Sequence, residues 1–568
     1  MSTIDWIVLV TTLLSIVLYG MWKSRGTKNI DGFLLADKKL PWYHVGLSVM
    51  ATQASAITFL SAPGQAYTDG LRFVQFYFGL PLAMVVLCIT FIPIFRKLNV
   101  YTAYEFLEKR FDKKTRLLTA FLFLLQRGLS TGITIYAPAI ILSTILGIDI
   151  TYTIILNGAI VILYTVYGGA KAVSYTQMLQ MGIIFASLFL AAYMVVHLLP
   201  QNVGFGDALH IAGKMNKLNA IDTHFDINNR YNIWSGIIGG FFLQLSYFGT
   251  DQSQVGRYLT GSSVAQSRLG LIMNGLIKIP MQFFILLIGV LVFTFYQYNK
   301  PPVFFNQTEV TKLESSSYKQ QYREIESRYK TLHAEKQEVV QELAIAMHGD
   351  KKEAIDKLQV LLNKKDKESN ALRADVTKLM EKNNPDAQTN DGNYVFLYFV
   401  THQLPVGVVG LLIAIIFLAS MGSMASGLNS LASATVVDFY KRLFNKDGSE
   451  KNYLNASRWS TLVWGIFCIA VALYAGKIGN LIEVVNILGS LFYGTILGIF
   501  LVAFYMKKIN GTVVFISAII AEIFVVVIWL NDLMAFLWFN VAGCLLLMVF
   551  AGLLHYILPK KTISEIAQ

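Results

Sequence analysis

The sequence has few charged residues, few cysteines and no recognisable catalytic cluster. Asp, Glu, Lys and Arg make up 14% of its 568 residues, whereas an ordinary soluble chain carries about 25%. Cys88, Cys468 and Cys544 lie far apart inside apolar stretches, without the spacing of a disulfide or a metal site. No His/Cys cluster or nucleophile–base pair stands out. We therefore expect that the protein is not an enzyme and that its cysteines are buried packing residues.

Long apolar runs dominate what the sequence does contain. Hydrophobic residues make up 55% of the chain, and alternating strand patterns are absent, which favours helices over a barrel. Many runs approach or exceed the ~20 residues that cross a ~30 Å hydrocarbon core as a helix. The run 396–438 is long for one crossing and is expected to continue past the membrane. We predict thirteen spans, at residues 5–22, 43–66, 73–95, 117–146, 151–168, 175–198, 232–254, 267–297, 396–438, 457–475, 481–506, 510–530 and 533–556.

The distribution of basic residues predicts the orientation. The first span is expected to be a retained helix, because no basic residue precedes Trp6–Trp22 and no small-residue cleavage site follows it. An odd number of spans places the termini on opposite sides. With the N-terminus outside, the cytoplasmic segments hold most of the Lys and Arg residues found outside one large insert. We predict a multi-pass protein of the bacterial inner membrane with a cytoplasmic C-terminus. The net charge of +12 then reflects topology, and no nucleic-acid partner is expected.

The large insert, residues 309–386, differs from the rest of the chain. It holds fifteen Lys/Arg and fifteen Asp/Glu residues. Apolar-leaning positions recur at 4-3 spacing before and after Gly349, the pattern of two heptad helices joined by a turn. We predict a periplasmic coiled-coil hairpin within 303–390, each arm projecting about 45 Å. Contact with a periplasmic partner and a self-contained hairpin without a transport role both remain open.

Two basic residues, Arg127 and Lys278, fall inside predicted spans. Charges at this depth usually face a cavity or a partner. Solute contact or gating is one interpretation of Arg127, and solute contact or bonding to neighbouring carbonyls are the interpretations of Lys278. The acidic residues Asp251 and Glu483 lie near span ends, where we expect solvation at the interface.

The second span is unusually rich in small and hydroxyl residues, including Thr52, Ser55 and Thr58, and Pro63-Gly64 interrupts it. Such a span is suited to unwinding at mid-membrane, where freed carbonyls bind a bare cation. Carbonyl and hydroxyl oxygens suit sodium without a carboxylate. The alternative is close helix packing through small residues, which needs no ion.

The ninth span supplies a second such stretch. Its small and hydroxyl residues fall at three- and four-residue steps, which forms a polar stripe along a helix. The two stretches suggest an inverted repeat of residues 43–198 and 232–506, although packing is again the alternative. The stripe consists of Ala419, Ser420, Ser423, Ser426, Asn429 and Ser430.

Several motifs in order resemble the sodium/solute symporter family over about residues 30–510, excluding the insert. ATQASAITFLSAPGQAY is similar to the first core helix of the bacterial sodium–sialic acid symporters. VYTAYEFLEKRF, TGITIYAPAIIL and YGGAKAV are similar to the iodide, monocarboxylate and multivitamin branch, and GTDQSQVGRYL and SMASGLNSLASATVVDFYKR match signatures of the sixth and eighth core helices. The resemblance implies a LeuT-like core of five plus five inverted-repeat helices, with an extra helix in 1–30 and two helices and a tail in 510–568.

The resemblance also implies a sodium site between the first and eighth core helices. Its ligands would be the carbonyls of Ala51, Ala54 and Ala419 and the hydroxyl of Ser423. Gly422 stands where the family usually has a hydroxyl residue, which removes one ligand. Gln177 occupies a position where much of the family has an Asp associated with a second sodium in some members, so one sodium ion is expected.

The resemblance further implies a small-molecule solute site near the membrane midplane. Ser130 aligns with an arginine of the sialic acid relatives. Arg127 lies one turn away on the same face, where we expect it to contact a carboxylate of the solute. We therefore expect import of an organic anion, such as a sialic acid or a monocarboxylate. A sugar, polyol or vitamin is the alternative solute, and a passive channel or a transporter-like sensor the alternative class. The implied contacts are Gln53, Ser55, Thr58, Phe73, Phe76, Tyr77, Arg127 and Ser130.

Overall fold

The computed structural model describes residues 1–24, 36–98, 100–201, 203–349, 351–475 and 479–557. Within these ranges the chain forms helices and no sheet, and a single bridge joins Leu40 to Gly261. Ten of the described helices are long and apolar enough to cross a membrane. The prediction of an all-α polytopic membrane protein is confirmed.

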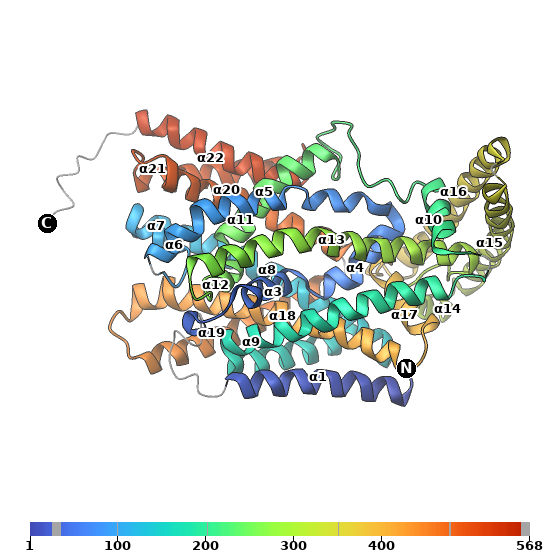
Figure 1. The fold of residues 1–568 in the computed structure, drawn as a ribbon, viewed down its shortest axis with the longest axis horizontal. Helices are drawn as coiled ribbons and strands as arrows, with labels where there is room; N and C mark the ends of the chain where they lie inside the picture. Colours follow the sequence, from blue (N-terminus) through green and yellow to red (C-terminus); the bar gives the residue numbers. More distant parts are fainter. Residues whose placement is uncertain (25–35, 99, 202, 350, 476–478, 558–568) are drawn as a thin grey trace.

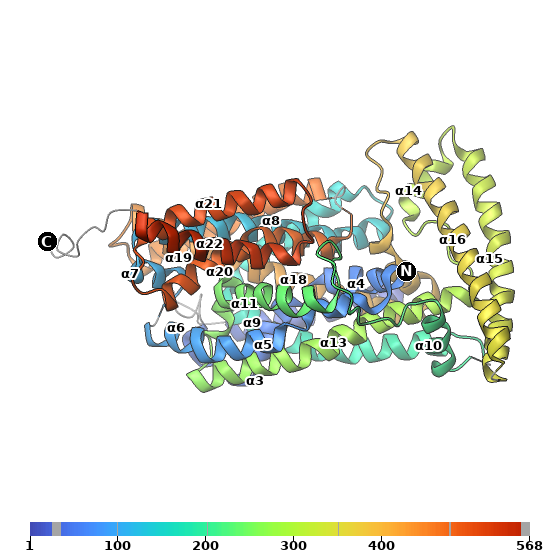
Figure 2. The same ribbon diagram turned by 90° about the horizontal axis from the view of Figure 1, so that it is seen from above.

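Most helices run along the long axis of the molecule, and two long helices of the insert lie across one end (Figures 1 and 2). The N-terminus lies toward this end, which we call the hairpin end, and α22 finishes at the opposite end, as an odd number of spans requires (Figure 1). The bundle helices are α1 (Thr3–Ser24), α3 (Trp42–Gln53), α4 (Ala56–Asp69), α5 (Leu80–Val86), α6 (Ile92–Leu98), α8 (Lys113–Leu146), α9 (Ile150–His197), α11 (Gly240–Thr250), α12 (Gln252–Tyr258), α13 (Val264–Tyr298), α18 (Val408–Ala434), α19 (Glu450–Tyr474), α20 (Leu481–Tyr505), α21 (Gly511–Leu530) and α22 (Leu537–Ile557).

α18 forms the centre of the bundle. Of its most apolar window 83% is buried, compared with 22% for α1 at the edge. It packs against α1, α8, α9 and α19. Small residues permit this crowding, since a Cβ at Gly427 would lie 2.5 Å from Thr131 Oγ1 of α8.

The second predicted span is broken, as the sequence suggests, but not where it suggests. α3 ends at Gln53 and α4 begins at Ala56, whereas Pro63 and Gly64 lie inside α4. The predicted interruption at Pro63-Gly64 is therefore wrong. A Cβ at Gly64 would lie 1.8 Å from the carbonyl oxygen of Gly392, so this glycine permits close approach of two backbones.

The run 396–438 is also not one helix. α17 (Val395–Gln403) precedes α18, and Pro405 and Gly407 separate them. Gly407 has φ +89°, a conformation that favours glycine. After α18 the chain continues as a π-helix, Thr435–Phe444. Helical structure thus continues beyond the predicted run, and the start of the run is a separate short helix.

α9 is a single helical element of 48 residues where the sequence predicts the two spans 151–168 and 175–198. A straight helix of this length would measure ~72 Å, more than twice a ~30 Å hydrocarbon core. Its first part contacts α8 and α19, and its last part contacts α3 and α13. The end of α8 and the helix α10 (Phe205–Lys214) that follows α9 both contact the insert. α9 therefore begins and ends at the hairpin end. Its two parts cross the bundle in opposite directions, so this one helical element contains both predicted spans.

The insert forms the predicted hairpin from α15 (Lys319–His348) and α16 (Lys352–Asn383), preceded by the short α14 (Gln307–Glu314). The predicted projection of its arms away from the bundle is wrong. The hairpin lies across the bundle (Figure 2). Polar contacts hold it there, such as the hydrogen bond from Gln337 Nε2 to the Tyr298 carbonyl at 2.7 Å. Most of its predicted apolar positions are buried, whereas Tyr318, Ile325, Leu332 and Leu358 are partly buried. The buried ones are Tyr322, Tyr329, Val339, Leu343, Ala346, Ile355, Leu362, Leu372, Val376 and Leu379.

We predict that Gly64→Ala lowers the apparent melting temperature of the purified protein, because its methyl group would overlap the Gly392 carbonyl. Gly182→Ala is the matched control, since a Cβ at this helical glycine meets nothing within 4 Å. Alanine is favoured over glycine in a helix by roughly 0.5–1 kcal/mol, so the control should be neutral or stabilising. Equal melting temperatures for the two variants would contradict the close approach.

Candidate functional site

The break between α3 and α4 leaves two buried carbonyls without their helical donors. In an unbroken helix, the carbonyls of Ala51 and Ala54 would accept from the amides of Ser55 and Thr58. The Ser55 amide instead donates to the Gln53 carbonyl at 3.1 Å, and the Thr58 amide donates to the Ser55 carbonyl at 3.0 Å. Oxygens freed in this way are suitable ligands for a hard cation.

α18 contacts both halves of the broken span and presents hydroxyl groups. Ser423 Oγ donates to the Ser420 carbonyl at 3.0 Å, so its lone pairs stay available. Ser420 Oγ is buried and has no hydrogen-bond partner among the described residues. The predicted ligands Ala51 and Ala54 thus lie on the broken span, and Ala419 and Ser423 lie on the helix packed against it.

A network of polar groups joins three helices, α3, α9 and α18, beside the break. Gln177 of α9 donates to Thr52 Oγ1 at 3.2 Å and to the Gly422 carbonyl at 3.3 Å. Gln177 Oε1 accepts from Ser48 Oγ at 2.6 Å. Thr52 Oγ1 in turn lies 3.1 Å from Ser426 Oγ. The Gln177 amide therefore donates to both the Thr52 hydroxyl and the Gly422 carbonyl.

Gly422 lies directly against the side chains of Gln177 and Gln180. A Cβ at position 422 would stand 2.6 Å from Gln180 Oε1 and 3.5 Å from Gln177 Cγ. A side chain at position 422 would therefore require the Gln180 amide to move, whereas Gln177 would remain at ordinary contact distance.

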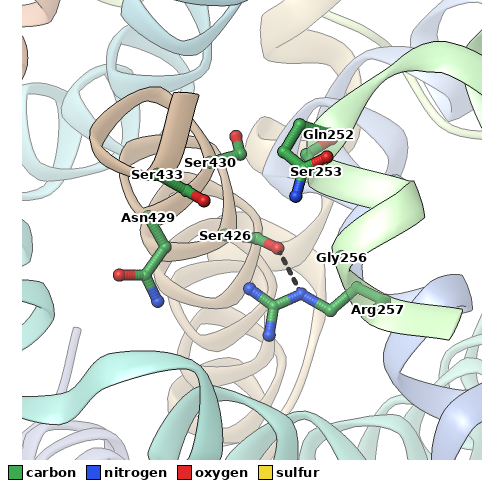
Figure 3. A pocket seen from close by; sticks show the side chains of 8 residues that line it. All are labelled: Gln252, Ser253, Gly256, Arg257, Ser426, Asn429, Ser430 and Ser433. Carbon is green, nitrogen blue, oxygen red and sulfur yellow. Dashed lines mark hydrogen bonds between the residues drawn. The ribbon is translucent and has the colours of Figure 1, made fainter. Parts of the chain in front are cut away.

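The polar stripe of α18 continues to a small cavity against α12 (Figure 3). Arg257 Nε donates to Ser426 Oγ at 2.9 Å, the dashed line in Figure 3. The cavity measures about 20 Å³, space for one water and not for a solute. Its lining comprises Gln252, Ser253, Gly256, Arg257, Ser426, Asn429, Ser430 and Ser433.

A larger cavity of about 90 Å³ adjoins the break and brings together most of the predicted solute residues. Phe73 does not line it; its ring stacks on Phe76 at 5.5 Å and supports that wall from behind. The predicted residues that line it are Gln53, Ser55, Thr58, Phe76, Tyr77, Arg127 and Ser130. Sequence reasoning missed six lining residues on α11 and α20, because α20 and the middle of α11 carry no motif: Leu243, Tyr247, Ile482, Val485, Asn486 and Tyr493. It also missed Ile57 of α4 and Gln126 of α8, which lie next to predicted residues.

Arg127 is paired with a carboxylate inside this cavity. Its Nη2 bonds Asp251 and donates to Tyr493 Oη at 3.1 Å, and the Tyr493 hydroxyl donates to Asp251 at 3.0 Å. Asp251 occupies the gap between α11 and α12 and is 1% exposed. The expectation that Asp251 is solvated at an interface is wrong, because the helix break carries it to the arginine. Arg127 Nε is buried without a partner in the described part of the chain.

The other two charged residues singled out in the spans lie differently. Lys278 is fully buried, its Nζ 5.8 Å from the centroid of the Tyr77 ring. Among the described residues it has no hydrogen-bond partner, so the interpretation that it bonds neighbouring carbonyls is wrong. Glu483 accepts from Arg230 at 2.8 Å and from the Tyr231 hydroxyl at 3.1 Å near the start of α20.

A helical bundle with a broken span, freed carbonyls at the break and a polar cavity beside them has the architecture of a secondary transporter. The model of the sodium:solute symporter family matches residues 33–313 and 380–521. The chain therefore belongs to this family, whose members couple solute movement to sodium. Most of the hairpin lies outside the matched ranges.

Individual relatives agree with this membership. The chain is 26% identical to the sodium/glucose cotransporter of Vibrio parahaemolyticus, over 89% of this chain and 82% of that one. It is 26% identical to a sodium/sialic acid symporter of Aliivibrio fischeri, over 96% and 92%. It is 34% identical to human sodium-coupled monocarboxylate transporter 1, over 46% and 42%. The solved structure of a substrate-bound, outward-open sodium-coupled sialic acid symporter covers 98% of both chains at 22% identity and a TM-score of 0.74, which shows the shared inverted-repeat fold.

We predict that Asp251→Asn or Arg127→Gln alone destabilises the protein by about 3–5 kcal/mol, because each leaves a buried charge unpaired. The double variant should cost much less than the sum of the two, as measured by unfolding of the purified protein. The pair Arg230–Glu483 is the matched control: Arg230 is 56% exposed, so its removal should cost at most about 1 kcal/mol. Additive effects of Arg127→Gln and Asp251→Asn would contradict a coupled pair.

Proposed function

We propose that this protein imports a small polar organic solute, preferentially an organic anion, together with one sodium ion across a bacterial inner membrane. The hairpin end and the N-terminus face outside, and the C-terminus faces the cytoplasm. The observation that carries the proposal is the pair of freed carbonyls at Ala51 and Ala54, which adjoin the cavity containing Arg127. Ion and solute then bind next to each other at one helix break.

In this mechanism, sodium from outside binds the carbonyls of Ala51, Ala54 and Ala419 and the Ser423 hydroxyl. Its positive charge replaces the lost helical donors and holds the break in a conformation that accepts the solute. Gln53, Ser55 and Thr58, which flank the break, contact the solute. Closure and rocking of the bundle then release both to the cytoplasm.

A single sodium ion is supported by Gln177. Its Nε2 donates to the Thr52 hydroxyl and the Gly422 carbonyl, where a second cation would need those oxygens as ligands. An N–H donor satisfies the oxygens without adding a charge. Uptake is therefore expected to rise hyperbolically, not sigmoidally, with sodium concentration.

An organic anion is supported by Arg127, whose unpartnered Nε retains a donor after pairing with Asp251. Sialic acid and monocarboxylate transporters among the relatives agree with this solute class. A neutral sugar or polyol is the second candidate, favoured by the neutralisation of Arg127 by Asp251 and by the Vibrio sodium/glucose relative.

We predict that Ser423→Ala greatly reduces sodium-driven uptake into proteoliposomes, because it removes the only side-chain ligand of the proposed ion site. Ser517→Ala on α21 is the matched control, since Ser517 is also buried but lies outside the proposed core. Replacement of external sodium by choline should abolish uptake. Unchanged uptake in choline would overturn the proposed coupling, and absence of labelled-solute counterflow would indicate a channel.

The charge of the solute predicts whether transport is electrogenic. One sodium ion with one monovalent anion moves no net charge, so a potassium diffusion potential should leave initial uptake of sialic acid or lactate unchanged. One sodium ion with a neutral sugar gains about 2.3 kcal/mol per 100 mV, so the same potential should accelerate uptake of glucose. Potential-driven glucose uptake with no uptake of either anion would select the second candidate.

A further inference from the structure

The hairpin is fastened to the bundle at separate points along both arms. Gln337 of α15 donates to the Tyr298 carbonyl at 2.7 Å. Gln359 of α16 donates to the Lys214 carbonyl at 3.0 Å, and Arg373 of α16 donates to the Val303 carbonyl at 3.0 Å. The hairpin thus forms a roof over the ends of α4 and α13 (Figure 2).

A cavity of about 150 Å³ lies under this roof, larger than the cavity beside the helix break. Aromatic rings from three elements form much of its wall: Tyr67 of α4, Phe293 and Tyr296 of α13, and Tyr329 of α15. An aromatic wall favours a ligand with carbon atoms over a bare inorganic ion.

The charges lining the cavity are mostly positive: Lys217, Lys336 and Arg373 against one carboxylate, Asp366. Lys336 is paired with Asp366 at 2.5 Å, and Arg373 is paired at 2.8 Å with Asp391, which lies outside the lining. Lys217 has no ion-pair partner in the described part of the chain. Its Nζ bonds the Thr68 carbonyl and lies 4.6 Å from the centroid of the Phe293 ring. Lys217 is a half-buried cation that Asp366 and Asp69 attract without forming an ion pair with it.

Three polar atoms in the lining also lack hydrogen-bond partners among the described residues: Tyr296 Oη, Gln297 Oε1 and His333 Nε2. Their residues are 1%, 2% and 7% exposed. Burial and the nearby Lys336 and Lys300 lower the pKa of His333 to about 4. The ring is therefore neutral at pH 7 and adds no charge to the cavity. Buried polar groups without partners indicate a missing ligand or water.

We propose that the cavity under the hairpin is a second binding site for a small organic carboxylate, held by Lys217 and independent of sodium. The ligand carboxylate forms an ion pair with Lys217, its carbon skeleton lies against the rings, and its hydroxyl or amide groups bond Tyr296 and Gln297. The hairpin residues that complete the site lie outside the matched family ranges, so the family model does not describe this site. Only the location of the site upstream of the central cavity rests on the proposed function; carboxylate binding itself does not.

The test is calorimetric titration of the full-length protein in nanodiscs, in low-chloride choline buffer and in sodium buffer. The probes are N-acetylneuraminate and lactate, with glucose as the neutral control. We expect at least one of the two anions to bind in choline, and glucose not to bind. Lys217→Met should weaken that binding about tenfold, the effect of losing one charge-assisted hydrogen bond. Lys300→Met is the matched control, since Lys300 is exposed at the same end and does not line the cavity, and it should leave binding unchanged.

Asp366→Asn provides a readout of opposite sign. It removes the one negative charge of the lining while its amide oxygen still accepts from Lys336, so anion binding in choline should tighten several-fold. A merely structural role of the cavity would make both variants weaker. No binding of either anion in choline, or shifts of Lys217→Met and Asp366→Asn in the same direction, would overturn the inference.

The two proposals fail separately. Sodium-dependent binding that Ser423→Ala removes, with no binding in choline, would leave the proposed function standing and refute the hairpin site. Binding in choline that Lys217→Met weakens, with no sodium-dependent uptake of any probe, would refute the proposed function and support the hairpin site.

Discussion

The break between α3 and α4 is the constraint on which the rest of the core depends. An unpaired peptide group in a membrane costs several kcal/mol, so a helix breaks there only where polar neighbours or a bound ion replace the lost bonds. The hydroxyl groups of α18 and the amide of Gln177 lie around this break for that reason. Small residues on α3 and α18 follow as a second consequence, because the two backbones must approach closely. The small-residue composition, the close packing of α3 and α18 and the candidate cation site therefore all depend on the same helix break.

Two buried ion pairs of α8 also involve irregular backbone, because the carboxylate of each pair lies where the regular α-helix is interrupted. Arg127 of α8 meets Asp251 in the gap between α11 and α12, and Arg116 of α8 meets Asp438 in the π-helix that follows α18 at 2.6 Å. Such pairs add little stability compared with apolar packing, but loss of one partner is costly. They therefore specify how α8 aligns with its neighbours. The pair Arg127–Asp251 also sets the charge of the central cavity, because Asp251 balances the positive charge of Arg127.

The parts of the structure that the sequence predicts depend on local pattern. The heptads of the insert predicted both hairpin arms, and seven of the eight predicted solute residues line the central cavity. Two features depended instead on distant contacts and were missed. The helix breaks at Ala54 and not at Pro63-Gly64, because α18 and α9 supply polar partners there and Gly392 packs on Gly64. The hairpin lies across the bundle because Tyr298 and Lys214 offer carbonyls to its glutamines, and no periodicity encodes such an angle.

Gly422 of α18 lies against Gln177 and Gln180 of α9. A Cβ at position 422 would lie 2.6 Å from Gln180 Oε1, whereas Gln177 Cγ would be at an ordinary contact distance of 3.5 Å. A hydroxyl residue there would collide with Gln180 unless that glutamine moved. Glycine leaves its carbonyl exposed, and Gln177 donates to it, so the oxygen is satisfied without an ion. The proposed single sodium is therefore supported by the hydrogen bonds of Gln177, and the glycine at position 422 avoids a close contact with Gln180.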